Sequence, residues 1–238
     1  MTPLLPAAIL GSPLTGVFVT LLAYRLALAA SRRGNGHPLA NRVLLGVLIL
    51  LLWLWLSGSS YGQYMEGARF IQLLLGPATV ALAVPLYGNL SRLKRAAAPL
   101  LLSIFAGGLA GMTSAAGLGW WLGLDRTVLV SLATRTVTTP IAMSLAGGLG
   151  GAPELAAMFV IVSGILGAVL APPLFRRLGW DDDMLLGVAT GVTAHGIGTA
   201  RVFHLSEAAG AFAGLAMGLN GVFTAMLLPW LVRWLQVG

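Results

Sequence analysis

The sequence predicts an all-α polytopic membrane protein, and three observations support this fold class. Of its 238 residues, 58% are hydrophobic and only 9% are charged, whereas a soluble domain carries about 25% charged residues. The apolar residues form runs of about 20, the length that crosses a bilayer as a helix. The basic excess, a formal net charge of +7, lies mostly in short loops beside these runs, where basic residues set membrane topology.

The apolar segments follow one another with short connections, so residues 1–238 are expected to form a single integral membrane domain. Most of the 32 glycines and 12 prolines lie inside the apolar runs, as is typical of closely packed membrane helices. The first run lacks a preceding basic region and is too long for a cleavable signal. The pattern indicates about eight hydrophobic segments, at roughly 3–30, 41–58, 68–90, 97–122, 127–148, 153–175, 183–202 and 206–236.

Loop charges predict the orientation of these segments. Basic clusters after the first and third segments indicate cytoplasmic loops: Arg32, Arg33 and Arg42, then Arg92, Lys94 and Arg95. Strict alternation would place the pair Arg176–Arg177 outside, against the same rule. The conflict disappears if the segment at 127–148 is re-entrant, dipping into the membrane and returning. The segment at 183–202 could do the same from the other side.

A weak internal repeat links these two segments. The stretch "GLDRTVLVSLATRTVTTP" begins at Gly123 and "GWDDDMLLGVATGVTAHG" begins at Gly179, and five of the 18 positions match at a spacing of 56. Asp125 and Asp181 each resemble the N-cap of a helix. Either these are two ordinary capped helices of similar composition, or one structural unit is used twice. Two re-entrant units would have opposite orientations, as in inverted-repeat transporters.

Both segments combine polar residues with helix breakers. The first contains "ATRTVTTPIAM" from Ala133 to Met143, and the second contains "GVATGVTAHGIGTAR" from Gly187 to Arg201. Breaks are expected near Pro140 and near 195–199. Unwound backbone survives inside a membrane only where protein buries it or where it lines a wet cavity. Secondary transporters build their substrate sites at such broken helices.

The distribution of charge indicates what such a site would bind. The seven acidic residues are all expected near segment ends: Glu66, Asp125, Glu154, Asp181, Asp182, Asp183 and Glu207. Arg135 is the deepest basic residue, and an ionisable group inside a membrane is a functional-site hypothesis by default. A positive site without a nearby carboxylate suits an anion. It suits poorly a sodium or proton site built from aspartate or glutamate.

The candidate substrate-binding residues are therefore Arg135, Thr136, Thr138, Thr139, Pro140, His195, Gly196, Gly198 and Thr199, with Arg201, Thr79 and Asn220 as a possible gate or secondary site residues. His195 is also a candidate for proton coupling. Simpler interpretations stay open. Arg135 could extend to the membrane interface, His195 could be a core residue bonded to a carbonyl, Arg201 could be a cytoplasmic anchor, and the threonines could bond to their own helices.

No enzyme signature accompanies this site. The three histidines lack metal-ligand spacing, and the sequence contains no HExxH, GxSxG or paired aspartates at mid-membrane depth. We therefore expect no catalysis, no metal and no cofactor. Because the basic excess is explained by topology, we expect no nucleic-acid partner, and the absence of cysteine excludes disulfides and thiolate chemistry.

Five stretches resemble the LrgB/CidB family, in the right order and over nearly the whole chain: "PATVALAVPLY" (77–87), "TVTTPIAM" (136–143), "GILGAVLAPP" (164–173), "HGIGTAR" (195–201) and "GAFAGLAMGLNGVFTAMLLPWL" (210–231). The family usually has Leu-Pro-Lys-Ser-Val before TTPIA. Here Thr134, Arg135 and Thr136 stand for Pro, Lys and Ser. The kink geometry can therefore differ from that of the family, and an arginine offers a bidentate fork where lysine offers a point charge.

The resemblance implies two kinds of function. Plant chloroplast members are glycolate/glycerate translocators, and bacterial members are linked to pyruvate movement. Bacterial members are also named antiholin- or holin-like, acting with a small LrgA/CidA membrane protein on murein hydrolase activity and lysis. The broken polar helices favour a secondary transporter of small monocarboxylates, such as glycolate, glycerate, pyruvate or lactate, by alternating access. We also expect a multi-pass protein of the bacterial cytoplasmic (inner) membrane, a homodimer, and a possible small LrgA/CidA-like partner.

Overall fold

All regular secondary structure is helical in the part of the chain that the structure, a computed structural model, describes: residues 12–34, 40, 42–74, 77, 87–88 and 90–234. No strand occurs in these ranges. The chain forms two compact units, residues 1–81 and residues 82–238. The predicted all-α fold class is confirmed, and four of the described helices are long and apolar enough to cross a membrane, namely Leu14–Arg33, Ala97–Trp121, Pro153–Arg177 and Glu207–Arg233.

The first unit consists of α2 (Pro13–Arg33), α3 (Arg42–Ser57) and α4 (Tyr61–Leu73). Small residues let these helices approach closely: Ala23 and Ala27 of α2 and Ala68 of α4 are all buried. The structure differs from the predicted third segment at 68–90, because α4 begins at Tyr61 and ends at Leu73. Most of the remainder of that segment, including the candidate Thr79, lies outside the described residues.

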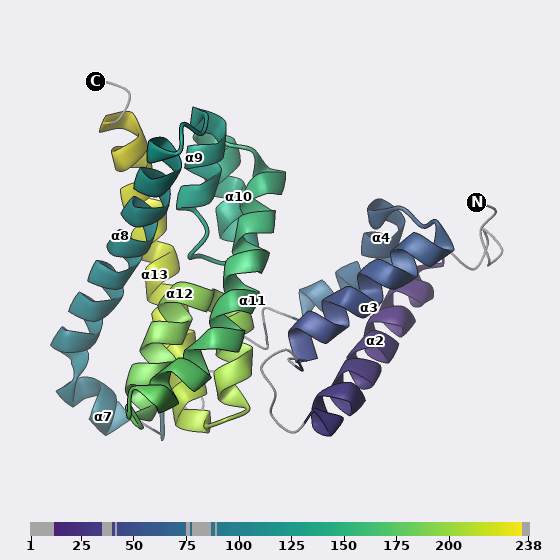
Figure 1. Cartoon of the computed structure of the whole chain (residues 1–238), viewed down its shortest axis with the longest axis horizontal. Coiled ribbons are helices and arrows are strands. Elements are labelled where there is room, and N and C mark those ends of the chain that lie inside the picture. Colours follow the sequence, from purple (N-terminus) through teal and green to yellow (C-terminus); the bar gives the residue numbers. More distant parts are fainter. Residues whose placement is uncertain are drawn as a thin grey trace. The chain divides into compact units, whose positions relative to one another are not determined.

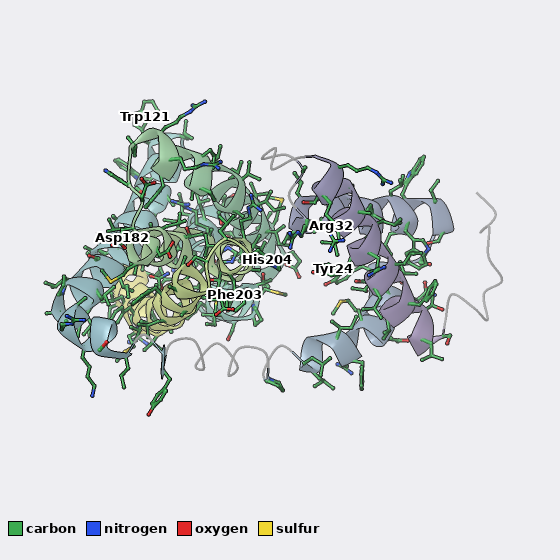
Figure 2. All side chains as sticks on the ribbon, turned by 90° about the horizontal axis from the view of Figure 1, so that it is seen from below. Tyr24, Arg32, Trp121, Asp182, Phe203 and His204 are labelled. Carbon is green, nitrogen blue, oxygen red and sulfur yellow. The ribbon has the colours of Figure 1, made fainter. Side chains whose placement is uncertain are left out.

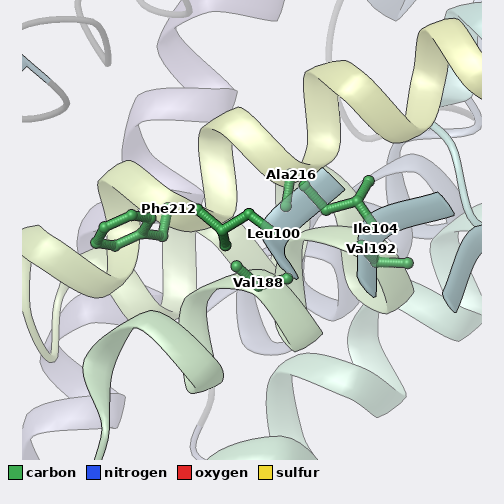
Figure 3. Close-up of a cluster of buried hydrophobic side chains, with 6 residues drawn as sticks. All are labelled: Leu100, Ile104, Val188, Val192, Phe212 and Ala216. Carbon is green, nitrogen blue, oxygen red and sulfur yellow. The ribbon is translucent and has the colours of Figure 1, made fainter. Parts of the chain in front are cut away.

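The second unit is built on three long helices, α8 (Ala97–Trp121), α11 (Pro153–Arg177) and α13 (Glu207–Trp234). The shorter elements are α7 (Leu90–Arg95), α9 (Arg126–Ala133), α10 (Thr139–Gly148) and α12 (Asp183–Phe203). One core cluster joins α8, α12 and α13 through Leu100, Ile104, Val188, Val192, Phe212 and Ala216 (Figure 3). Outside this core the side chains of both units are largely apolar (Figure 2), as lipid contact requires.

Helices α9 and α10 form a hairpin that does not cross the unit, and we call it hairpin 1. The Ser131 hydroxyl of α9 bonds to the backbone of Ala152, where α11 begins, accepting from its N–H at 2.8 Å and donating to its C=O at 3.2 Å. Ala142 and Ala146 of α10 pack against Ala156 and Val160 of α11, so the chain that enters along α9 leaves along α10. Both helices lie at one end of the unit (Figure 1).

Helix α12 is a second hairpin, which we call hairpin 2. Its two halves, 183–194 and 196–203, are separated by a non-helical backbone at His195. The Ser206 hydroxyl, just beyond the second half, donates to the Asp183 carboxylate at the start of the first, at 2.6 Å. Val202 packs with Leu186 and Ala209, so the second half returns to the end from which the first half started. That end is opposite to the one that hairpin 1 enters (Figure 1).

The two hairpins belong to an internal repeat of long helix and hairpin. Helices α8 and α11 are both 25 residues long and begin 56 positions apart. Each ends in the same motif: Gly123 (φ 72°) and Gly179 (φ 68°) take a left-handed conformation, and the next N–H bonds to the carbonyl five residues back, from Leu124 to Gly119 and from Trp180 to Phe175. Because α8 and α11 run in opposite directions, the repeat is inverted, as the weak sequence match indicates.

An aspartate caps each hairpin at its entry. The Asp125 carboxylate accepts from the Val128 N–H at 3.0 Å. The second cap is Asp182, not Asp181 as expected from the repeat, and its carboxylate accepts from the N–H groups of Met184 and Leu185. The second cap is therefore shifted by one residue relative to the first.

The hairpins also remove the conflict in the loop charges. Ala96 and Pro99, beside α7, line the same surface groove as Phe175 and Trp180, at the end of α11. The basic residues of α7 and the pair Arg176–Arg177 therefore lie at the same end of the unit. The positive-inside rule predicts that this end is cytoplasmic.

Candidate anion site at the hairpin tips

The tips of the two hairpins meet near the middle of the three long helices. Asn220, midway along α13, donates from its amide nitrogen to two carbonyls: Thr136 at the tip of hairpin 1, at 2.9 Å, and Val192 near the tip of hairpin 2, at 3.4 Å. On α11, Ser163 donates to the Arg135 carbonyl at 2.9 Å, and the Val160 carbonyl contacts His195 at 2.9 Å. The residues most strongly predicted as a site thus lie in one region.

Arg135 occupies the break between α9 and α10, which covers residues 134–138. Its guanidinium donates to the carbonyl of Gly111, near the middle of α8, at 3.4 Å, and its side chain is half-buried. Hydrogen bonds hold the unwound backbone around it, since the Arg135 carbonyl has Ser163 as donor and the Arg135 N–H donates to Leu132. The break is therefore an ordered loop with a cation at its centre.

The acidic residues of the second unit stay away from this cation. All six lie at or just before the start of a helix: Asp125, Glu154, Asp181, Asp182, Asp183 and Glu207. The seventh, Glu66, lies within α4 of the first unit. In the part of the chain that the structure describes, no group of three or more His, Cys, Asp or Glu side chains could hold a metal ion.

The predicted hydroxyl residues around Arg135 have different surroundings. Thr136 is buried, with its methyl group facing Gly111 and its carbonyl bonded to Asn220. Thr138 is the N-cap residue of α10, without a side-chain capping bond, and Thr139 begins that helix. Pro140 is exposed in the first turn of α10, where a missing N–H leaves no helical bond unmade. It therefore starts the second half-helix, and the break lies before it.

The backbone of hairpin 2 is broken at one residue, His195. Its φ of 39° and ψ of −132° lie in a region that residues other than glycine rarely adopt. Such strain persists only where surrounding contacts fix it, and it gathers at functional sites. The Val160 carbonyl is one such contact, and it makes Nε2 the protonated ring nitrogen in the neutral form. This is also the contact expected of a buried core histidine, so both interpretations of His195 remain.

The other predicted residues of hairpin 2 are less central. Thr199 is buried but donates to the His195 carbonyl in its own helix, at 2.7 Å. Gly198 lies against Thr190 and Ala194 in the first half, where it lets the halves approach, and Gly196 is exposed. Arg201 lies in the last turn of α12, near the entry of the hairpin and away from its tip. The predicted break at 195–199 is thus confined to His195.

Each hairpin tip contains one helix C-terminus and one helix N-terminus, which carry partial charges of opposite sign. Helix α9 and the first half of α12 end here, and each helix C-terminus carries a partial charge of about −0.5. Helix α10 and the second half of α12 begin here, and their free N–H groups carry the corresponding positive charge. Such N-termini bind anionic groups. Together with Arg135 they could hold a small carboxylate.

Four glycines that the sequence did not single out as site residues accommodate the tips. A Cβ at Gly111 would be 2.9 Å from the Thr136 methyl, and one at Gly164 would be 2.6 Å from the His195 ring. Gly108 lies against the Asn220 side chain and Gly167 against Ala194. Gly108 and Gly164, like Gly111 and Gly167, are 56 positions apart. Extending the repeat backwards from Gly123 would have identified them.

Gly164→Ala is expected to displace His195, because the added methyl group would overlap its ring. Gly218→Ala on α13 is the matched control, since a Cβ there meets nothing within 4 Å. We expect the control to match the parent protein, whereas Gly164→Ala lowers the melting temperature by roughly 2–8 °C, for an overpacking cost of about 1–2 kcal/mol. Thermal unfolding of the purified proteins measures both. Equal melting temperatures would show that His195 can move freely.

Comparisons with known proteins show the family of the chain. Residues 20–234 match the LrgB-like family. A Bacillus subtilis protein described as uncharacterized protein YwbG is 33% identical over 224 residues, which cover 93% of this chain and 98% of the relative. The antiholin-like protein LrgB of the same organism is 28% identical, over 93% and 96% of the two chains. The holin-like protein CidB of Staphylococcus epidermidis is 27% identical, over 91% and 94%. No solved structure matches the chain.

Proposed function

The chain belongs to the LrgB-like family, and on that premise we propose that it is a secondary carrier of small monocarboxylates in the cytoplasmic membrane. The observation that carries the proposal is the meeting of two oppositely oriented hairpins beside a half-buried arginine. Broken helices at mid-depth and an inverted repeat are the features that secondary transporters use for alternating access.

The geometry also supports the class of substrate. A short 2-hydroxy or 2-keto acid offers one carboxylate and one further oxygen. Arg135 supplies a forked donor for the carboxylate, and the start of α10 adds free N–H groups. Thr138 and Thr139, both half-buried beside that helix start, offer hydroxyls for the second oxygen. Glycolate, glycerate, pyruvate and lactate all share this pattern.

A second candidate function has the support of the relatives' names. Relatives similar over more than 90% of the chain are named antiholin-like and holin-like proteins. A protein of this kind would act on the membrane together with a small LrgA/CidA-type partner and modulate murein hydrolase export and lysis. That partner, like the expected homodimer, stays a prediction.

Purified protein in liposomes separates the two functions. The carrier predicts saturable uptake of labelled glycolate or pyruvate by this chain alone, with competition by unlabelled monocarboxylates and none by dicarboxylates. Release of an uncharged dye of similar size, or flux that requires the small partner, would instead support the holin-like function. Empty liposomes and liposomes with heat-denatured protein provide the baseline.

A further inference from the structure

Three oxygen atoms close to the hairpin tips are buried without a hydrogen-bond partner among the described residues: Thr136 Oγ1, Asn220 Oδ1 and Thr224 Oγ1. Their residues are at most 2% exposed. Buried polar atoms are nearly always paired, so each exception calls for an explanation. Two neighbouring buried hydroxyls behave normally, since Thr190 and Thr199 donate to carbonyls of their own hairpin.

The residues that carry the three oxygens lie in one region, where α8, α13 and the tip of hairpin 1 meet. The Asn220 amide nitrogen bonds to the Thr136 carbonyl, and its oxygen faces Gly108 of α8. Thr136 faces Gly111, one turn further along α8. Thr224 is one turn beyond Asn220 on the same face of α13, before Leu228, which packs with Met112 of α8. The three residues therefore lie on neighbouring turns beside the same stretch of α8.

Two of the four half-helix ends at the tips are C-termini, which attract a cation. Helix α9 and the first half of α12 both end at the tips, and each C-terminus carries a partial charge of about −0.5. The Asn220 amide nitrogen donates hydrogen bonds to one carbonyl near each of these C-termini, those of Thr136 and Val192. Its oxygen is thus fixed as an acceptor without a donor. The two threonine hydroxyls offer further lone pairs.

We propose that Thr136, Asn220 and Thr224 form a binding site for a sodium ion. Hard cations take oxygen ligands, and in transporters unwound carbonyls and half-helix C-termini coordinate sodium. The side chains here are neutral, which fits a monovalent ion better than calcium or magnesium, because both of these bind through carboxylates. Soft metals would need thiolate or imidazole.

Arg135, next to Thr136 in the chain, opposes this ion, because like charges repel strongly in a low-dielectric region. A bound carboxylate would reduce the repulsion, so anion and cation would each strengthen the binding of the other. Co-transport of the ion with the anion rests on the proposed function. Binding of sodium to the protein does not depend on that function.

The test is the thermal unfolding of the purified full-length protein, without any organic anion. Sodium chloride is titrated against choline chloride at constant ionic strength. We expect the melting temperature to rise with sodium and to saturate, by about 3–6 °C at ten times the dissociation constant. Thr136→Val and Thr224→Val should abolish the rise, because valine keeps the shape and removes the oxygen. Thr224→Ser, which keeps a hydroxyl, should retain it.

Thr190→Val is the matched control, since it removes a buried hydroxyl that already has a partner, and it should keep the full sodium effect. The proposal is overturned if choline gives the same rise, if sodium gives none, or if both valine variants respond like the parent protein. In those cases a buried water pairs the three oxygens. Because no organic anion is present, the result does not depend on whether the protein is a carrier, which the liposome experiment decides.

Discussion

Arg135→Ala is expected to abolish saturable uptake of monocarboxylate in liposomes while the protein stays folded. The guanidinium is the central cation of the hairpin 1 break, and its hydrogen bond to the Gly111 carbonyl is long, at 3.4 Å. Its removal should therefore cost little stability. Truncating one member of a buried charge pair costs about 2–5 kcal/mol, so substrate affinity should fall by roughly 30-fold or more. Initial uptake rates over a range of glycolate concentrations give this value.

Two further variants give this experiment its controls. Arg126→Ala removes an exposed arginine at the start of the same hairpin, and we expect its uptake to equal that of the parent protein. Arg135→Lys keeps the charge but loses the fork, so it should retain part of the uptake at a higher half-saturating concentration. Full uptake by folded Arg135→Ala would refute the assignment of the carboxylate site.

Asn220→Leu should have the largest effect on stability. The substitution nearly preserves volume, but it removes the donor for two buried carbonyls, Thr136 and Val192, and with it the bond that joins the two hairpin tips. Buried groups that lose a partner cost about 1–3 kcal/mol, and hydrogen bonds between membrane helices lie at the lower end of such values. The melting temperature in sodium-free buffer should therefore fall by roughly 2–12 °C.

Thr224→Val, one turn along α13, is the control for Asn220→Leu. Its hydroxyl has no partner to lose among the described residues, so in sodium-free buffer it should melt at the temperature of the parent protein or slightly above. If Asn220→Leu melts there too, the two bonds do not hold the tips together, and the hairpins are positioned by their packing on α8 and α11 alone.

The sequence predicted most of the fold because membrane helices follow from simple rules of length and charge. The pair Arg176–Arg177 was the most informative signal for topology. It can be cytoplasmic only if one of the preceding segments returns without crossing the membrane. The structure confirms both hairpins. The predicted start of the third segment, at residue 68, is wrong, because the polar start of α4, "YGQYMEG" from Tyr61, lowers hydropathy although it is helical.

The candidate site was predictable only in part. Arg135 and His195 stand out because a charge and a glycine-rich break are rare inside apolar runs. Which residues would touch them was not visible, because contact between distant helices depends on their rotation and depth. The sequence predicts only a secondary role for Asn220, although it joins the two tips. Gly108 and Gly164 have no chemistry of their own, and their role follows from the bulk that a side chain would add.

If the protein is a carrier, as we propose, the inverted repeat suggests how it could reach a second conformation. Residues 97–148 and 153–203 contain the same parts in opposite orientation, yet their tips differ, since hairpin 1 has an unwound loop and hairpin 2 a single turn at His195. If each repeat adopted the backbone conformation of the other, the substrate site would open toward the opposite side of the membrane. Distances between pairs of introduced cysteines in this cysteine-free chain could then be compared with both states.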